Sequence, residues 1–178
     1  MGINVLIIIS VVMLFIIFLI VLFNSRGKLL ILDIKITEAE KELDSLYEIK
    51  KELLFSICKK IDELAQKELF SNIEELNNEN LDSFELSNLL NSIENKLINE
   101  MSMRKAFVPD DEDSILFSSL ESASIDCKSV EKYYNDTADK FNKLLRRFPS
   151  NIIGKMKDYK NADKYTYEEE EMFEILKD

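Results

Sequence analysis

The sequence of 178 residues contains no histidine and no tryptophan, and it has only three glycines, two prolines and two cysteines. Without histidine the chain lacks the commonest general base and metal ligand, and the side chain that changes charge near neutral pH. So few glycines and prolines exclude a turn-rich β-sandwich and a glycine-rich phosphate loop, and they suit a mostly helical protein. Cys58 and Cys127 are too far apart in sequence to form a CxxC redox pair or a zinc framework. We interpret them as small core side chains in a reducing compartment.

Acidic residues outnumber basic ones by 34 to 23, so the formal net charge is −11. A surface of that sign repels nucleic-acid phosphates and anionic headgroups, and we expect no nucleic-acid partner. The acidic excess is concentrated in the runs Asp110–Asp113 and Glu168–Glu171. Such runs are typical of solvated loops and tails. The alternative is a divalent-cation site, but neither run has the alternating spacing of a calcium loop, and we expect no metal and no cofactor.

One long apolar run is present at the N-terminus. Residues 5–23 read VLIIISVVMLFIIFLIVLF and are apolar except for Ser10. At 1.5 Å per residue the run spans roughly 28 Å, close to the hydrocarbon core of a bilayer at about 30 Å. A cleavable signal peptide is the alternative, but it would have a shorter apolar part, basic residues before it and small residues after it. We therefore predict a retained membrane helix, with the lipid bilayer as the partner of residues 5–23.

The basic residues lie on one side of this run. Residues 1–24 contain no lysine or arginine, whereas Arg26, Lys28 and Lys35 follow it closely. The positive-inside rule then places the N-terminus outside the cell and the remainder in the cytoplasm. Reduced cysteines agree with that side. The prediction is a single-pass protein of the cell membrane.

The first apolar stripe after the run indicates one long amphipathic helix that continues from the membrane span. Its members alternate by three and four residues: Ile36, Ala39, Leu43, Leu46, Lys50, Leu53, Ile57, Ile61 and Leu64. The polar segment 71–80 breaks this pattern and is predicted to be a connection.

Two further helices follow. Asp82 and Glu85 have the spacing of a capping box and open a helix whose stripe runs from Leu86 to Met101. Pro109 ends that region, because proline lacks an N–H and disfavours helix before itself. A third long helix is predicted from about residue 114 to 148.

These elements define an all-α fold. We predict a single transmembrane helix followed by an antiparallel helical bundle of three long helices plus a short C-terminal helix. Residues 1–24 would be the short tail and anchor, 25–158 the bundle, and 159–178 an acidic C-terminal tail.

Aromatic residues recur every seven positions near the end of the third helix. Tyr134, Ala138, Phe141, Leu145 and Phe148 alternate by four and three residues, which is typical of one seam of a helix packed on its neighbours. Asn135 and Asn142 stand at the edge of this seam, where an amide can bond a facing backbone or side chain.

Pro149 is predicted to stop the helix. Ser150 or Asn151 could then cap a short new helix that carries three apolar residues back onto the bundle: Ile152, Ile153 and Met156. Phe148 would close the seam.

The stretch YNDTADKFNKLLRRFPSNIIG resembles the C-terminal signature of the LemA family, Y-N-x-x-V-x-x-Y-N-x-x-I-x-x-F-P-x-N-L-I-A. Identical positions are Tyr134, Asn135, Asn142, Phe148, Pro149, Asn151 and Ile153. Conservative replacements are Ala138, Phe141, Leu145, Ile152 and Gly154.

The first soluble helix is similar to the same family at Glu38, Ala39, Asp44 and Leu53. It departs from the family pattern at Glu40, Phe55 and Ser56, which replace a Trp, a Pro and an Asn, and Glu131 stands where the family usually has Arg. Residues 65–125 are compatible in pattern. The chain is identified as a divergent member.

This resemblance implies a membrane helix followed by an antiparallel helical bundle on the cytoplasmic side, and it supplies no catalytic residues. The signature residues, including Phe141, are therefore expected to be structural. The leading hypothesis is a membrane-tethered interaction or scaffold module with an unknown protein partner. The alternative is a structural membrane protein that self-associates. An enzyme would need a nucleophile–base pair or paired carboxylates, and we do not expect one in a chain without histidine and with acids in runs.

Overall fold

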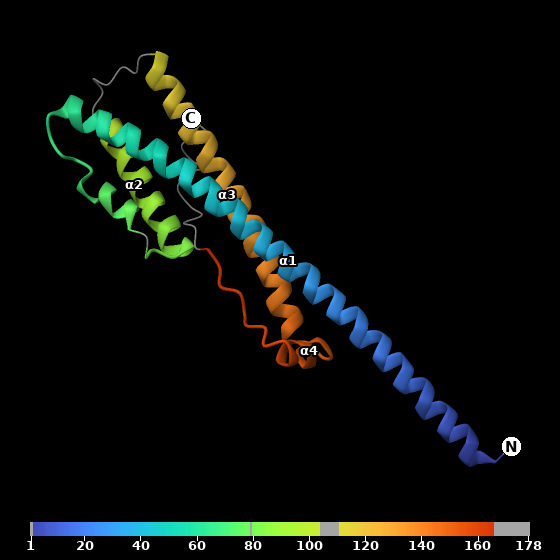
Figure 1. Ribbon diagram of the computed structural model, residues 1–178. Coiled ribbons are helices and arrows are strands. Elements are labelled where there is room, and N and C mark those ends of the chain that lie inside the picture. Colours follow the sequence, from blue (N-terminus) through green and yellow to red (C-terminus); the bar gives the residue numbers. More distant parts are fainter. Residues whose placement is uncertain (1, 79, 104–110, 166–178) are drawn as a thin grey trace. The chain divides into compact units, whose positions relative to one another are not determined.

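The computed structural model describes residues 2–78, 80–103 and 111–165 (Figure 1). Within these ranges the chain contains helices and no strand, which confirms the all-α class. The elements in order are α1 (Ile3–Ala65), the 3-10 helix η1 (Ser71–Asn77), α2 (Ser83–Met103), α3 (Asp111–Leu145) and α4 (Ser150–Met156).

The helices divide into two compact units. Unit 1 combines α1 up to Glu38 with residues 134–164, which include the end of α3 and all of α4. Unit 2 contains the remainder of α1, then η1, α2, the first part of α3, and Tyr165.

Helix α1 is unbroken from the apolar run into the amphipathic stripe (blue to cyan in Figure 1), as the sequence predicts. By length and composition its N-terminal part could cross a membrane, and none of its most apolar segment is buried. Among the described residues it is the one helix with this property.

One face of α1 is covered within unit 1. Phe18 and Leu22 are half-buried, and Ser25, Leu29 and Ile36 are buried, so the covered positions recur every three or four residues. The covered face thus reaches back into the apolar run. The stripe predicted from Ile36 is confirmed as far as Ile61, because its members up to there are buried or half-buried, and it is wrong at Leu64, which is 63% exposed in the last turn of α1.

The seam of α3 is confirmed at its first three positions, because Tyr134, Ala138 and Phe141 are buried. The prediction that Phe148 belongs to the buried seam is wrong, because its side chain is 70% exposed. Helix α3 ends at Leu145, so Phe148 falls in the following turn and out of helical register. The Phe148 ring stacks instead on Phe18 of α1, with a centroid separation of 6.0 Å.

The predicted cap of the short helix is also wrong. Pro149 is the N-cap residue of α4, and no side chain caps the helix by a hydrogen bond. Ile153 is buried as expected, but Ile152 and Met156 are exposed. A helix of seven residues has a narrow inner face, and Ser150, Ile153 and Gly154 fill it here.

In unit 2, α3 runs antiparallel to α1. Tyr47 bonds Glu131, and further along α1 Lys60 pairs with Asp113 at the start of α3. Later residues of α1 thus meet earlier residues of α3. Asp113 is buried in this pair, whereas the rest of the run Asp110–Asp113 carries no described side chain.

Helix α2 runs in the same direction as α1. Ser83 donates a hydrogen bond to Asp44 at 3.0 Å, and Glu94 pairs with Lys50 at 2.7 Å, so contacts advance together along both helices. The connection between them must therefore return along α1. It contains η1, within the segment 71–80 predicted to be a connection, and η1 buries Leu76.

The capping box at the start of α2 is confirmed. The Glu85 N–H donates to Asp82 Oδ1 at 2.7 Å, and the Asp82 N–H donates to Glu85 Oε2 at 3.2 Å. This reciprocal pair satisfies two backbone donors and fixes where α2 begins after the return connection.

The predicted acidic tail begins at residue 159, and the structure describes contacts of several residues between 159 and 165. Tyr159, Ala162 and Lys164 contact α3, and Tyr165 is buried in unit 2. The packed chain therefore extends to Tyr165. The run Glu168–Glu171 lies outside the described residues.

The seam generates a stability prediction. Replacing buried Phe141 by Ala should lower the free energy of unfolding by about 3–5 kcal/mol, because a large buried side chain leaves a cavity. Lys143 is exposed and lies outside the seam, so replacing it by Ala should change the free energy of unfolding by less than about 0.5 kcal/mol. Denaturant melts of the full chain in detergent measure both, and equal effects would show that the seam is misassigned.

Candidate functional site

The family-like signature lies in unit 1, where it fastens the chain that follows α4. The Asn142 side chain donates to the Ala162 carbonyl at 2.8 Å and accepts from the Ala162 N–H at 2.9 Å. The Phe141 ring meets Tyr159 edge-on at 5.5 Å. The expectation that Asn142 bonds a facing backbone from the seam's edge is thus confirmed.

The other signature residues have separate positions. Tyr134, Asn135 and Pro149 are buried, Phe148 lies in the turn between α3 and α4, and Asn151 lies in the first turn of α4. The signature residues therefore connect the turn after α3 with the segment that follows α4. Their side chains do not meet in one open site.

Tyr159 also connects this segment to α1. Burial raises the pKa of Tyr159, and the Asp33 carboxylate raises it further through its charge and a hydrogen bond, while Arg26 lowers it. The phenol therefore remains a protonated donor near neutral pH.

A buried lysine lies between α1 and α2 in unit 2. Lys50 is 1% exposed, and its Nζ contacts Glu94 Oε2 at 2.7 Å and donates to Asn91 Oδ1 at 2.9 Å. The sequence placed Lys50 in an apolar stripe without assigning it partners. The sequence signal for such partners was a charged residue at a core position of the stripe. A buried ammonium group requires a paired carboxylate or other acceptors.

A buried carboxylate lies between all three helices of this unit. Tyr47 Oη and Ser87 Oγ both donate to Glu131 Oε1, each at 2.7 Å. Burial strongly raises the pKa of Tyr47, and the nearby Glu131 charge adds to the effect. Tyr47 therefore stays a hydrogen-bond donor, and Glu131, which departs from the family pattern, is held by two hydroxyl groups.

Neither cysteine is a reactive thiol. Burial raises the pKa of Cys58 to about 12 and that of Cys127 to about 11. At pH 7 only about one thiol in ten thousand or fewer would then be a thiolate, the nucleophilic form. Because folding favours the protonated thiols, their stabilising contribution is complete below the unfolded pKa near 8.5 and is lost as pH rises towards 11–12.

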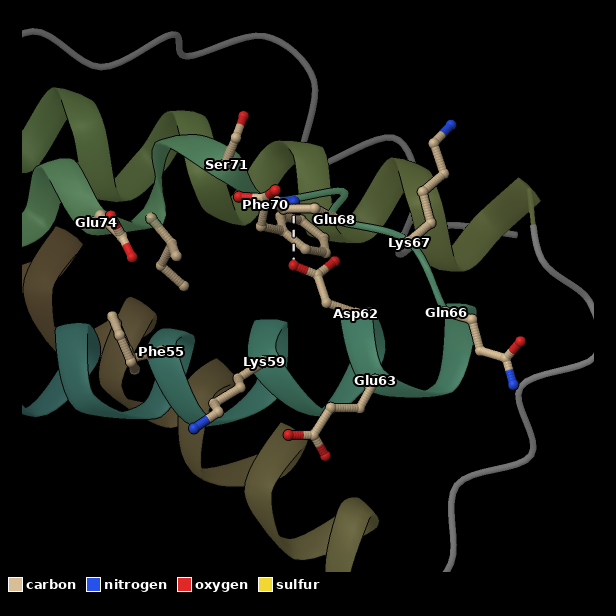
Figure 2. A pocket seen from close by; sticks show the side chains of 11 residues that line it. Phe55, Lys59, Asp62, Glu63, Gln66, Lys67, Glu68, Phe70, Ser71 and Glu74 are labelled. Carbon is tan, nitrogen blue, oxygen red and sulfur yellow. Dashed lines mark hydrogen bonds between the residues drawn. The ribbon is translucent and has the colours of Figure 1, made fainter.

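A surface groove of about 520 Å³ lies between the end of α1 and η1 (Figure 2). Its lining combines apolar residues with charged and amide groups: Phe55, Lys59, Asp62, Glu63, Gln66, Lys67, Glu68, Phe70, Ser71, Ile73 and Glu74. Asp62 accepts hydrogen bonds from the Leu69 and Phe70 N–H groups at 2.8 and 3.4 Å, and the second is the dashed line in Figure 2. These bonds fix the turn, and Gln66 and Lys67 lie at the edge of the groove.

A second groove of about 520 Å³ adjoins the first along α1. It is lined by Lys51, Glu52, Phe55, Ser56 and Asn77, so Phe55 borders both grooves. We call this combined surface the α1 groove. Phe55 is the apolar side chain that the two parts of the α1 groove share.

The described residues contain no group of three or more Cys, Asp or Glu side chains positioned to hold a metal ion. Their strongest charged cluster instead consists of the Lys50 and Glu131 contacts, in which each charge already has partners. The α1 groove is a second kind of feature, since its lining combines apolar and charged side chains at the surface.

Comparison with known proteins gives one match. A sequence model of the LemA family matches residues 78–175, which is more than half of the chain. The match includes the complete signature from Tyr134 to Gly154. No curated protein and no solved structure matches the chain.

The two hydroxyl groups that donate to Glu131 lead to a second prediction. Ser87→Ala or Tyr47→Phe should each lower the free energy of unfolding by about 1–3 kcal/mol, because a buried carboxylate loses a donor. The double variant should cost more than the sum, since both donors serve the same oxygen atom.

Urea melts of the full chain in detergent measure this cycle. Ser92, which is exposed on α2, supplies the control, and Ser92→Ala should stay within about 0.5 kcal/mol of the parent. A strictly additive double variant would contradict the shared-acceptor geometry.

Proposed function

The chain belongs to the LemA family, and from that membership together with the unbroken helix α1 we propose that it acts as a membrane-anchored interaction or scaffold module without enzymatic activity. Residues 5–23 cross the bilayer once, with the N-terminus outside and the helical units in the cytoplasm. The observation that carries the proposal is the absence of any linker between the apolar run and the packed helix, so the anchor is part of the folded protein.

The distribution of charge supports this orientation. The sequence ranges of unit 1, 1–38 and 134–164, contain eleven basic and six acidic residues, a net charge of +5. The rest of the chain contains twelve basic and 28 acidic residues, a net charge of −16. Basic residues next to a membrane span favour the cytoplasmic side, and they attract the anionic lipids of that leaflet.

The polar groups of the core support a non-enzymatic role. Lys50 and Glu131 are buried charges that act on Cys127, and both are bonded to structural partners. The cysteines themselves are protonated. A general base with an open path to a substrate is missing from this cluster.

The α1 groove supports a role in recognition. Its centre is apolar through Phe55 and Ile73, and its rim carries Asp62, Glu63 and Glu74. An apolar centre with a charged rim is the usual organisation of a protein-binding surface. The acidic excess of unit 2 favours a partner with a basic amphipathic segment.

Self-association is the second candidate, and one surface favours it. The face of α1 opposite its covered stripe exposes Phe23, Leu30, Ile31 and Ile34, and Gly27 lies among them with open space at its Cβ position. An apolar face that continues from the membrane run suits a second copy of the same helix.

Photocrosslinking in cells separates the two candidates. Benzoylphenylalanine at Gln66 in the α1 groove should give a discrete adduct with another protein, and Phe55→Ser should abolish that adduct by removing the apolar centre. The exposed position Asn95 on α2 is the matched control and should give none.

The same probe at Gly27 reports on self-association. A dimer of the chain at Gly27, with no adduct at Gln66, would replace the scaffold proposal by the self-associating one. Adducts of equal yield at Gln66 and Asn95 would indicate chance encounters, and they would contradict a specific groove partner.

Thiol labelling tests the orientation. In intact cells a membrane-impermeant maleimide should label Gly2→Cys, whereas Glu63→Cys should react only after lysis. Background from Cys58 and Cys127 should be low because both are buried and protonated. The reverse pattern would overturn the assigned topology.

A further inference from the structure

The turn after α3 and helix α4 expose a cluster of large apolar side chains. We call residues 146–157 the α4 corner. Phe148 is 70% exposed, Ile152 37% and Met156 80%, and the three are spaced by four residues. The inner side of the same short helix is packed through Ile153 and Gly154. The outer side therefore presents apolar groups that the fold of unit 1 does not cover.

The contact between Phe148 and Phe18 sets the depth of this corner relative to the apolar run. Phe18 lies five residues before Phe23, the last residue of the predicted span. At 1.5 Å per residue that is about 7.5 Å inside the end of the span. Amphipathic elements that lie on membranes bury their apolar side to a similar depth, about 5–10 Å, at the boundary between headgroups and acyl chains.

The charged residues of the corner and its flanks are nearly all basic. Six exposed cations are found between residues 143 and 160, against the single acid Asp158: Lys143, Arg146, Arg147, Lys155, Lys157 and Lys160. This density stands out in a chain of net charge −11. Exposed apolar groups within a basic surround are the pattern of an interfacial membrane contact with anionic lipids.

We propose that the α4 corner is a second membrane contact. Phe148, Ile152 and Met156 enter the interfacial region of the leaflet from which α1 emerges, and the surrounding lysines and arginines meet anionic headgroups. The proposal rests on the membrane span of the proposed function. It adds that unit 1 is held at the bilayer at two places, which restricts the tilt and rotation of α1.

The bilayer is a better occupant than a protein partner for two reasons. The Phe18 contact places the corner at a level where lipid surrounds a single-pass helix. The flanking cations would repel an identical surface on a second copy, whereas anionic headgroups complement them.

The absence of tryptophan allows a direct test with the full chain reconstituted in vesicles. Single tryptophans replace Phe148, Met156, Phe15 in the span and Ile115 in unit 2, the last two being 60% and 65% exposed. Emission is measured with nitroxide labels placed either near the headgroup or deep in the acyl chain. The vesicles consist of phosphatidylcholine alone or mixed with phosphatidylglycerol.

We expect the deep label to quench Phe15→Trp most strongly and the shallow label to quench Phe148→Trp and Met156→Trp most strongly. Ile115→Trp should be unaffected. Met156 is decisive, because Phe148 already contacts α1. Quenching at Phe148→Trp without quenching at Met156→Trp would overturn the second contact while leaving the span intact. Failure of quenching at Phe15→Trp would instead overturn the membrane span itself.

Two further measurements test whether lipid or a second copy of the chain covers the α4 corner, and whether its basic residues contribute. Shallow quenching at Met156→Trp should persist when the ratio of lipid to protein is raised, and its loss on dilution would identify a second copy as the occupant. In vesicles with phosphatidylglycerol, Arg146→Glu together with Arg147→Glu should weaken this quenching. Equal quenching with and without the two changes would refute the role of anionic headgroups.

Discussion

The packing of one face of α1 is the constraint on which the rest of the structure depends. A single unbroken helix contains the apolar run and the covered stripe of unit 1, and it is also the first packed helix of unit 2. Its covered positions, such as Leu29 and Leu43, admit neighbours on one side only. Residues 134–164 cover α1 in unit 1, and α2 together with the first part of α3 covers it in unit 2.

Buried charge then restricts how the helices of unit 2 can be arranged. Lys50 needs Glu94 and Asn91 from α2, and Glu131 of α3 needs Tyr47 and Ser87. A shift of one helix by a single turn would leave an ammonium or a carboxylate in the core without partners, at a cost of several kcal/mol. We therefore regard this cluster as the element that sets register, while the apolar contacts supply most of the stability.

Sequence reasoning succeeded where the periodicity of a helix decides the outcome. The continuity of α1, the capping box of Asp82 and Glu85, and the seam through Phe141 all follow from spacing along one helix. It failed where the chain leaves a helix: Phe148 was extrapolated beyond the end of α3. The direction of α2 and the partners of Lys50 depend on contacts between distant segments, which local spacing does not contain.

The acidic composition is distributed unevenly along the chain, so its sum and its local values lead to different expectations. A net charge of −11 predicted repulsion from anionic headgroups, yet the sequence ranges of unit 1 carry +5 and include the apolar run. Because salt screens charges over about 10 Å, a membrane surface responds to the residues beside it and not to the sum over the chain. Arg146 and Lys155 are near Phe148 in the sequence, and Phe148 contacts the apolar run at Phe18. The local sign of the charge, and not the sum over the chain, is therefore the quantity on which the proposed contact with anionic headgroups depends.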